Sequence, residues 1–238
     1  MQNQKTIIVT GASRGIGRAI LEKYMQAGWQ VVFCSKNEDS VTKTLQELTE
    51  KYPNTLIDGK VCDMSKKTEV LAFASHCSSN YTNIQILVNN AGVYIPGEIS
   101  SGNYDDNLEE LMQINLYSAY WMGKILIPYL EAKKNGYIVN ISSIAGIQAY
   151  PNGGSYAITK FALTGYTKTI REELKTKNIK VIGIYPGATY TDSWASSDLP
   201  AERFVAAEDI ANIIFQATSL SNSAVIEDII IRPQLGDI

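Results

Sequence analysis

A tyrosine and a lysine stand four residues apart, Tyr156 and Lys160, in a segment whose pattern predicts a helix over 155–176. This spacing places two side chains on one helical face. A free tyrosine has a pKa of about 10. A neighbouring positive charge favours the phenolate and lowers the pKa of the tyrosine. The pair therefore indicates a proton donor or acceptor that works near neutral pH. The alternative is a packed ring beside a solvated amine, which implies no chemistry.

A glycine-rich turn follows the first predicted strand and leads into a helix, with Gly11, Gly15 and Gly17 spaced G-x-x-x-G-x-G. Glycines permit a tight turn and a close approach of the backbone to a pyrophosphate, and a helix N-terminus offers free N–H groups to an anion. Such a turn can be purely architectural, but its place after the first strand favours nucleotide binding. No Gly-Lys-Ser/Thr sequence follows, which argues against a P-loop.

The end of the second predicted strand bears on which nicotinamide cofactor would bind. NAD sites usually carry an acidic residue there, but this strand ends in Ser35 and Lys36. Without a carboxylate, a 2′-phosphate is not repelled, and Lys36 and Arg14 are cations within reach of it. These residues favour NADP(H). The alternative is that both cationic side chains only cover the surface.

Composition excludes several classes of protein. The 238 residues, 45% of them hydrophobic, suffice for one large core. A net charge of −3 is unlike that of a nucleic-acid binder, and no apolar run approaches the roughly 20 residues that span a bilayer. We therefore expect a cytoplasmic protein that binds neither nucleic acid nor membrane.

The cysteines and the histidine also limit the chemistry. Cys34, Cys62 and Cys77 are scattered and odd in number, which fits buried thiols in a reducing compartment better than disulfides or a metal site. The single histidine, His76, leaves no pattern for a Ser-His-Asp hydrolase or a multi-histidine metal centre. We expect it at the surface, at the end of a helix.

Strand-like and helix-like stretches alternate along the chain. The predicted strands are 6–9, 30–34, 55–61, 84–88, 136–141, 179–184 and 226–231. The predicted helices are 16–27, 39–51, 66–79, 105–133, 155–176 and 207–218. This alternation favours parallel βαβ units. We expect a single doubly wound Rossmann-type α/β domain over residues 1–238, with a mostly parallel seven-stranded sheet and helices on both faces. Ligands bind such sheets beyond the carboxyl ends of the strands.

Several motifs in a fixed order resemble the short-chain dehydrogenase/reductase family, and the resemblance covers essentially the whole chain. They are the glycine turn at 10–17, Asn89-Asn90-Ala91-Gly92, Asn115, Ser143 thirteen residues before Tyr156, Lys160, and the Pro186-Gly187 turn. The resemblance implies that Tyr156 protonates a carbonyl oxygen that Ser143 orients. It also implies that Lys160 lowers the tyrosine pKa and binds the nicotinamide ribose, and that Asn115 anchors a water linking Lys160 to solvent.

The resemblance also implies a set of cofactor contacts. Asp63 would meet the adenine amino group, although it also fits a cap on the following helix. Thr189 and Thr191 would bind the phosphate or the carboxamide. The implied set comprises Gly11, Ser13, Arg14, Gly15, Ile16, Gly17, Ser35, Lys36, Asp63, Met64, Asn90, Ala91, Gly92, Tyr156, Lys160, Pro186, Gly187, Thr189 and Thr191.

The surroundings of the predicted site follow from the same resemblance. A substrate lid is expected near 190–204, with Trp194 closing over an apolar substrate or filling a packing gap. The rest of the pocket wall is expected to comprise Tyr94, Ile95, Pro96, Ala145, Gln148 and Tyr150. The predicted helices 105–133 and 155–176 resemble those that pair across the family's dimer interface, so we expect a homodimer or homotetramer.

The function that these residues predict is NADP(H)-dependent hydride transfer with a small carbonyl or alcohol substrate. One alternative is a 3-oxoacyl-(acyl-carrier-protein) reductase, for which Lys133, Lys134, Lys175 and Lys177 offer a basic surface among Glu131, Glu172 and Glu173. Another is a nucleotide-sensing regulator without turnover. The complete set of Asn115, Ser143, Tyr156 and Lys160 argues against a pure sensor.

Overall fold

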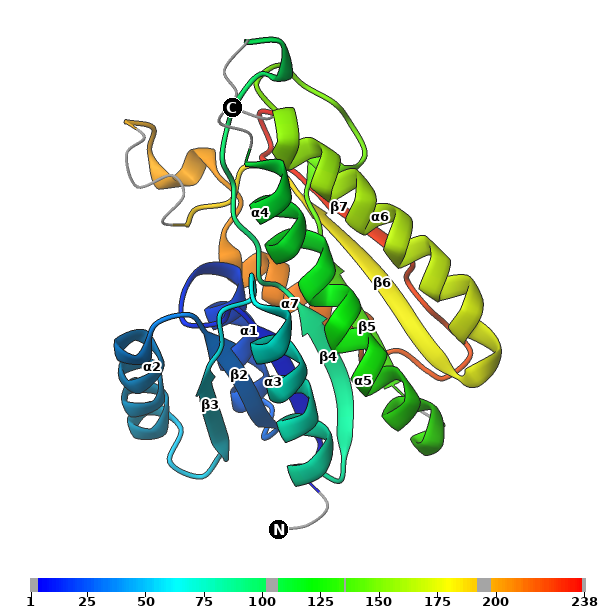
Figure 1. Cartoon of the computed structure of the whole chain (residues 1–238). Helices are drawn as coiled ribbons and strands as arrows, with labels where there is room; N and C mark the ends of the chain where they lie inside the picture. The colour runs from blue at the N-terminus through cyan, green and yellow to red at the C-terminus, as the bar shows by residue number, and fades with distance from the viewer. Residues whose placement is uncertain (1–3, 102–106, 135, 192–197, 237–238) are drawn as a thin grey trace.

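The computed structural model describes residues 4–101, 107–134, 136–191 and 198–236, whose strands form one seven-stranded sheet (Figure 1). The strands are β1 (Thr6–Thr10), β2 (Gln30–Ser35), β3 (Ile57–Val61), β4 (Ile84–Asn89), β5 (Gly136–Ile141), β6 (Ile179–Pro186) and β7 (Asp228–Ile231). Their order is β3-β2-β1-β4-β5-β6-β7, and every neighbouring pair is parallel. The doubly wound α/β fold is confirmed, with a described sheet that is wholly rather than mostly parallel.

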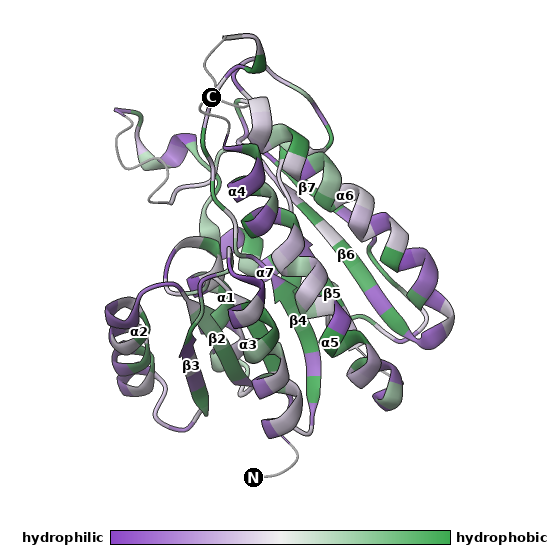
Figure 2. Ribbon diagram, in the orientation of Figure 1, coloured by the Kyte–Doolittle hydropathy of each residue, from purple (hydrophilic) through white to green (hydrophobic). Residues whose placement is uncertain are grey.

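Helices cover both faces of the sheet. One face carries α1 (Gly15–Gln26), α2 (Glu38–Lys51) and α7 (Ala207–Ala217); the other carries α3 (Lys67–Asn80), α5 (Ser118–Lys133) and α6 (Gly154–Leu174). Successive strand residues point to opposite faces, so in β1 Ile7 packs with the first set and Ile8 with the second. Figure 2 shows the hydrophobic residues gathered on the inner strands, whereas the edge strand β3 is hydrophilic.

The predicted helix 105–133 is not one regular helix. Its described part consists of α4 (Leu108–Met112), a π-helical turn η2 (Gln113–Tyr117) and α5, while residues 105–106 lie outside the described residues. A π-helical turn inserts an extra residue into the helical ladder and is often found at functional sites. Here it carries Asn115.

Smaller differences concern the ends of elements. The third and last strands begin at Ile57 and Asp228, two residues later than predicted in each case, and α6 ends at Leu174, where the short 3-10 turn η4 (Lys175–Lys177) follows. Three further 3-10 turns are η1 (Ile99–Ser101), η3 (Ile144–Gly146) and η6 (Ala201–Arg203). No helix within the described ranges is both long enough and apolar enough to cross a membrane.

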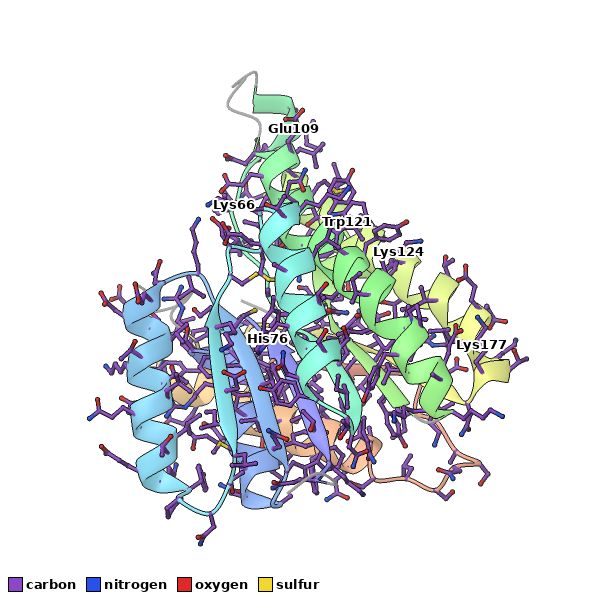
Figure 3. The ribbon with its side chains drawn as sticks, turned by 60° about the horizontal axis from the view of Figure 1, so that its bottom comes forward. Lys66, His76, Glu109, Trp121, Lys124 and Lys177 are labelled. Carbon is purple, nitrogen blue, oxygen red and sulfur yellow. The ribbon has the colours of Figure 1, made fainter. Side chains whose placement is uncertain are left out.

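His76 has partners that the sequence did not suggest. It projects from the last turns of α3, and its Nε2 lies 2.8 Å from Asp58 Oδ2 in β3 (Figure 3). Tyr81 also donates a hydrogen bond to Asp58 Oδ2. The histidine therefore ties α3 to an edge strand rather than standing alone at the surface.

Candidate active site

The four candidate catalytic side chains come from three segments that meet beyond the carboxyl ends of the central strands (Figure 1). Ser143 lies two residues after β5, Tyr156 and Lys160 lie near the start of α6, and Asn115 lies in η2. This edge is where parallel α/β sheets bind ligands.

Lys160 is buried beside Tyr156. Its side chain is 4% exposed, and its Nζ donates a hydrogen bond of 3.1 Å to the Ile141 carbonyl oxygen at the end of β5. The same Nζ lies 5.7 Å from the centre of the Tyr156 ring. The helical spacing thus brings the two groups together as predicted from the sequence.

The direction of the tyrosine pKa is opposite to the expected one. Burial raises the pKa of the Tyr156 phenol to about 12, and a hydrogen bond with Ser143 only partly offsets this. Burial also lowers the pKa of Lys160 to about 8. Loss of hydration is thus the largest influence on both pKa values, and Tyr156 is protonated at neutral pH.

Ser143, rather than the adjacent Ser142, reaches Tyr156. The Ser142 hydroxyl is buried and hydrogen-bonded to the Lys160 carbonyl oxygen at 3.2 Å and to Thr164 Oγ1 at 3.3 Å. The Ser143 Oγ accepts a hydrogen bond of 3.1 Å from the Ala145 N–H and contacts the Tyr156 phenol. Both serines line the cleft, but the Ser142 hydroxyl is bonded to α6, whereas the Ser143 hydroxyl contacts the Tyr156 phenol.

At Gly146 the turn η3 comes very close to α6, and this contact fixes the distance of Ser143 from the helix. A Cβ atom on Gly146 would lie 2.5 Å from Ser142 Oγ and 2.7 Å from both the Lys160 carbonyl oxygen and Thr164 Oγ1. Only glycine lets η3 rest directly on α6 at this point. The serine and the tyrosine are thereby held at contact distance.

Asn115 holds the loop that follows β4. Its Oδ1 accepts a hydrogen bond of 2.8 Å from the Val93 N–H, and its Nδ2 donates to the Val93 carbonyl oxygen and to Thr159 Oγ1, each at 3.0 Å. The carboxamide thus joins the loop after β4 to α6. Gly92 lies between Asn115 and Lys160, since a Cβ there would be 3.3 Å from Asn115 Oδ1 and 3.2 Å from Lys160 Nζ.

The glycine turn after β1 has the conformation that its sequence predicted. Gly11 and Gly15 have φ angles of +64° and +56°, in the left-handed region. A Cβ on Gly11 would lie 2.9 Å from the Ala91 Cα. Asn90 Nδ2 donates to the Thr10 and Gly11 carbonyl oxygens, both at 2.9 Å. Asn90 and Ala91 therefore brace the turn from β4.

The turn suits the pyrophosphate of a dinucleotide. In the described structure no side chain caps the N-terminus of α1 and its first turn holds no acidic residue. The N–H groups and the positive end of the helix dipole therefore remain available to an anion. Thr191 lies beside this turn, because a Cβ on Gly15 would be 3.2 Å from its Cγ2.

The predicted adenosine end brings its polar residues together in pairs. Ser13 Oγ and Ser35 Oγ are 2.9 Å apart, and Lys36 Nζ lies 3.2 Å from Asp63 Oδ2. Asp63 Oδ1 also accepts hydrogen bonds from the N–H and hydroxyl of Ser65. These bonds close a turn ahead of α3 and do not cap the helix, because its N-cap residue is Lys66 and has no side-chain cap; the alternative of a helix cap is therefore wrong. Burial alone would raise the pKa of Asp63, but its bonds with Ser65 and Lys36 lower it below the usual value. Arg14 directly precedes α1 in extended backbone.

Met64 lies below this end of the site in a buried cluster of sulfur atoms. Its Sδ is 3.7 Å from Cys34 Sγ and 3.6 Å from Cys62 Sγ. Cys34, Cys62 and Cys77 are buried free thiols, as the sequence suggested. The Met64 side chain is therefore part of the core.

A cleft of about 300 Å³ opens at the candidate catalytic residues. The residues that line it are Ile16, Tyr94, Ile141, Ser142, Ser143, Ile144, Gln148, Tyr150, Tyr156, Pro186, Gly187, Ala188, Thr189 and Thr191. Of the predicted wall, Tyr94, Gln148 and Tyr150 line the cleft, whereas Ile95, Pro96 and the buried Ala145 do not. Trp194 lies outside the described residues.

Three supporting residues were not predicted. Thr159 holds Asn115 at 3.0 Å, and the Thr10 hydroxyl accepts the N–H groups of Asn90 and Ala91 at 3.1 Å and 3.0 Å. Val205 pairs with Thr189 in a short parallel bridge and so fixes the chain after β6. The only signal for Thr159 was its place next to Lys160; the other two depend on contacts distant in sequence.

Comparisons with known proteins agree with this arrangement. A family model described as short chain dehydrogenase matches residues 5–201. The 3alpha-hydroxysteroid dehydrogenase of Mediterraneibacter gnavus is 31% identical over 93% of each chain, and the sepiapterin reductase of Chlorobaculum tepidum is 30% identical over 98% of this chain and 97% of its own. A crystal structure of a metagenomic short-chain oxidoreductase in complex with NADP superposes with a TM-score of 0.84 at 27% identity, covering 98% of both chains.

The match to the family model spans most of the chain, and the matches to the two relatives extend over nearly the whole length of both proteins. The chain belongs to the short-chain dehydrogenase family of oxidoreductases.

Proposed function

We propose that this protein is an NADP(H)-dependent oxidoreductase that interconverts a carbonyl compound and the corresponding alcohol, with Tyr156 as the general acid and base. The observation that carries the proposal is the contact between Ser143 and Tyr156 next to the buried Lys160, in a cleft that also reaches Ile16 in the first turn of α1. One cleft thus joins a candidate proton donor to a candidate phosphate site.

The bound nicotinamide would supply the hydride, and the chain would supply the proton and the placement. Ser143 orients the carbonyl oxygen, and Tyr156, protonated at neutral pH, donates its proton to that oxygen during reduction. The Lys160 ammonium then stabilises the phenolate that remains. Asn115 keeps the 93–97 loop in place and anchors a water toward Lys160. In the direction of oxidation, the phenolate takes the proton back.

NADP(H) is favoured over NAD(H) by Ser35, Lys36 and Arg14 at the end where an acidic residue would select NAD. The metagenomic relative in complex with NADP supports this choice. Lys36 is paired with Asp63 at 3.2 Å, so a 2′-phosphate would share the lysine with that carboxylate. Hydrogen bonds to charged groups contribute about 1.5–3 kcal/mol each.

The proposal extends to the organisation of the chain. We propose that the chain forms one nucleotide-binding domain and that its segment 190–204 closes over the substrate. We also propose that α5 and α6 pack against a second copy of the chain. An acyl-carrier protein is a less suitable partner, because Lys177 is paired with Glu131 at 2.6 Å and Lys175 with Glu172. These pairs neutralise part of the basic surface that an acidic carrier would need.

A spectrophotometric assay of NADPH and NADH oxidation with a panel of carbonyl compounds tests the proposal. Because the relatives are named for a hydroxysteroid and for sepiapterin, the panel includes ketosteroids, sepiapterin, sugars, simple ketones and a 3-oxoacyl thioester. We expect turnover with at least one carbonyl compound and faster turnover with NADPH. Binding of NADPH without turnover on any compound would instead support a nucleotide sensor.

A further inference from the structure

Tyr94 contacts the candidate proton donor directly. The rings of Tyr94 and Tyr156 meet edge to face, with their centres 4.9 Å apart and their planes at 82°. The Tyr94 phenol is also hydrogen-bonded to that of Tyr150, on the turn before α6. All three rings line the cleft. Tyr94 therefore joins the loop after β4 to both the catalytic tyrosine and the opposite wall.

The loop that carries Tyr94 is fixed at both ends. Asn115 binds both the N–H and the carbonyl oxygen of Val93, at 2.8 Å and 3.0 Å. At the other end, the Gly97 N–H donates to the Asn152 carbonyl oxygen at 3.0 Å. A Cβ on Gly154 would lie 2.3 Å from the Gly97 carbonyl oxygen, so the loop rests directly on the start of α6. The ring of Tyr94 is consequently held against Tyr156.

We propose that Tyr94 is a positioning residue for the reaction: its ring holds the Tyr156 phenol in line with Ser143 and shields it from water on the side of the loop. This inference rests on the proposed function. It also gives Asn115 a second purpose, because the carboxamide places Val93 and thereby Tyr94. Edge-to-face packing of this kind has a preferred geometry, and proton transfer depends steeply on alignment.

The proposal predicts an effect on the pH dependence of catalysis. The titratable groups that face Tyr156 are Tyr94 on the loop, Tyr150 on the turn and Lys160 on its own helix. Burial is the largest cause of the raised pKa of Tyr156, and a smaller electrostatic contribution in the same direction comes from the Tyr94 hydroxyl. Removing the Tyr94 ring admits water and lowers the tyrosine pKa. Since reduction needs the protonated phenol, the alkaline limb of kcat moves to lower pH.

The experiment compares Tyr94→Leu with Tyr94→Phe, using NADPH at saturation and the best carbonyl substrate of the wild type. For Tyr94→Leu we expect kcat to fall about 3- to 10-fold, the alkaline limb to move to lower pH, and the dissociation constant of NADPH to stay the same. Tyr94→Phe keeps the ring and is expected to retain the wild-type kcat, with a much smaller displacement of the alkaline limb than Tyr94→Leu, because only the electrostatic contribution of the hydroxyl is lost. Tyr94→Met carries the same expectation as the leucine variant if that variant folds poorly.

A matched control removes an aromatic ring far from the cleft. Tyr52, which ends α2 and accepts a hydrogen bond of 3.1 Å from Gln26, is changed to leucine. We expect Tyr52→Leu to lower the Tm without moving kcat or its pH profile. This control separates loss of stability from loss of positioning.

Three outcomes would overturn the proposal while leaving the function intact. A Tyr94→Leu enzyme with the wild-type kcat and alkaline limb removes the positioning role. A rise in substrate KM alone makes Tyr94 a substrate contact, and equal losses in Tyr94→Phe and Tyr94→Leu assign the effect to the hydroxyl. A wild-type protein without turnover contradicts the proposed function instead.

Discussion

Lys160 is a cation in a place that costs the folded protein stability. Burial lowers the pKa of its ammonium to about 8, against about 10.4 for a free lysine. Between these pH values the unfolded chain binds more protons than the folded one, so stability rises with pH in this window. At neutral pH the buried ammonium therefore lowers the free energy of unfolding, while it remains available to stabilise a phenolate in the reaction.

Lys160→Met is expected to stabilise the protein while abolishing its activity. Methionine fills a similar volume without a buried charge, although the Ile141 carbonyl oxygen loses its donor. In the absence of nucleotide we expect the Tm to rise by about 2–4 °C at pH 7, or about 1 kcal/mol for a chain of this size. The gain should shrink as the pH rises through 8 to 10, because the wild-type ammonium then deprotonates. Thermal melts at several pH values test this, and a lower Tm at pH 7 would contradict it.

The choice of cofactor also belongs to single residues. Ser35→Asp combined with Lys36→Ala places a carboxylate at the end of β2 and removes the cation that lies 3.2 Å from Asp63. We expect the ratio of kcat/KM for NADPH to that for NADH to fall by about 100-fold, because the variant loses the charged hydrogen bond of Lys36 and its new carboxylate repels the 2′-phosphate. Lys66→Ala, which removes an exposed lysine paired with Glu69, serves as the control. If the NADPH/NADH ratio of the double variant were unchanged, residues other than Ser35 and Lys36 would have to recognise the 2′-phosphate.

At the scale of elements, the alignment of the site depends on how closely η3 approaches α6. Gly146→Ala would place a methyl group 2.5 Å from Ser142 Oγ and 2.7 Å from the Lys160 carbonyl oxygen. Overpacking of this kind costs about 1–3 kcal/mol. We expect a lower Tm and a lower kcat, because Ser143 directly precedes η3 and moves with it.

Gly165→Ala is the matched control for this substitution. It adds the same methyl group to α6 at a position where, among the described residues, no atom beyond the adjoining helix backbone lies within 4 Å of the new Cβ, and alanine favours helix over glycine by about 1 kcal/mol. The control should therefore keep its activity and gain stability. If Gly146→Ala behaved like Gly165→Ala, the close approach would not be what aligns Ser143.

Some of these elements could be predicted from sequence, and others could not. The alternation of β-branched runs with amphipathic stretches predicted every strand to within a few residues, because burial on both faces leaves a local pattern. The π-helical turn at Asn115 left no such pattern, and the bonds that Asn115 makes there, to Val93 and Thr159, join residues distant in sequence. The pairing of Lys36 with Asp63 likewise joins β2 to the segment after β3 and has no local signal.

At the scale of the whole molecule, exposed apolar side chains gather on two helices and the π-helical turn. Tyr117 and Tyr120 lie on η2 and α5, and Ile158 and Phe161 lie on α6, with exposures of 38–44%. Apolar surface of this kind commonly marks an interface, and a symmetric dimer is the commonest assembly.

Phe161→Glu is expected to convert a dimer or tetramer into a smaller species. A charge on this face would be buried unpaired against the second copy. Sedimentation velocity at micromolar concentration measures the change, and Ile213→Glu on α7, where the isoleucine is also 38% exposed, is the control. A wild-type protein that sediments as a monomer would contradict the predicted assembly.

The order of motifs along the chain predicted which side chains meet, because parallel strands bring their carboxyl ends to one edge. It did not predict the protonation of the site. Whether a phenol is made more or less acidic depends on the balance between hydration and charge around it. That balance is set by burial, by the hydrogen bond with Ser143 and by the electrostatic effect of Tyr94, all of which arise only when the chain has folded.

The most direct test of the proposed mechanism is the kcat of Tyr156→Phe with saturating NADPH and the best carbonyl substrate of the wild type. General acid catalysis contributes about 10²–10⁴-fold, so kcat should fall by at least about 100-fold while NADPH binds with unchanged affinity. A variant that turned over at the wild-type rate would show that the proton comes from elsewhere and that the site was wrongly assigned.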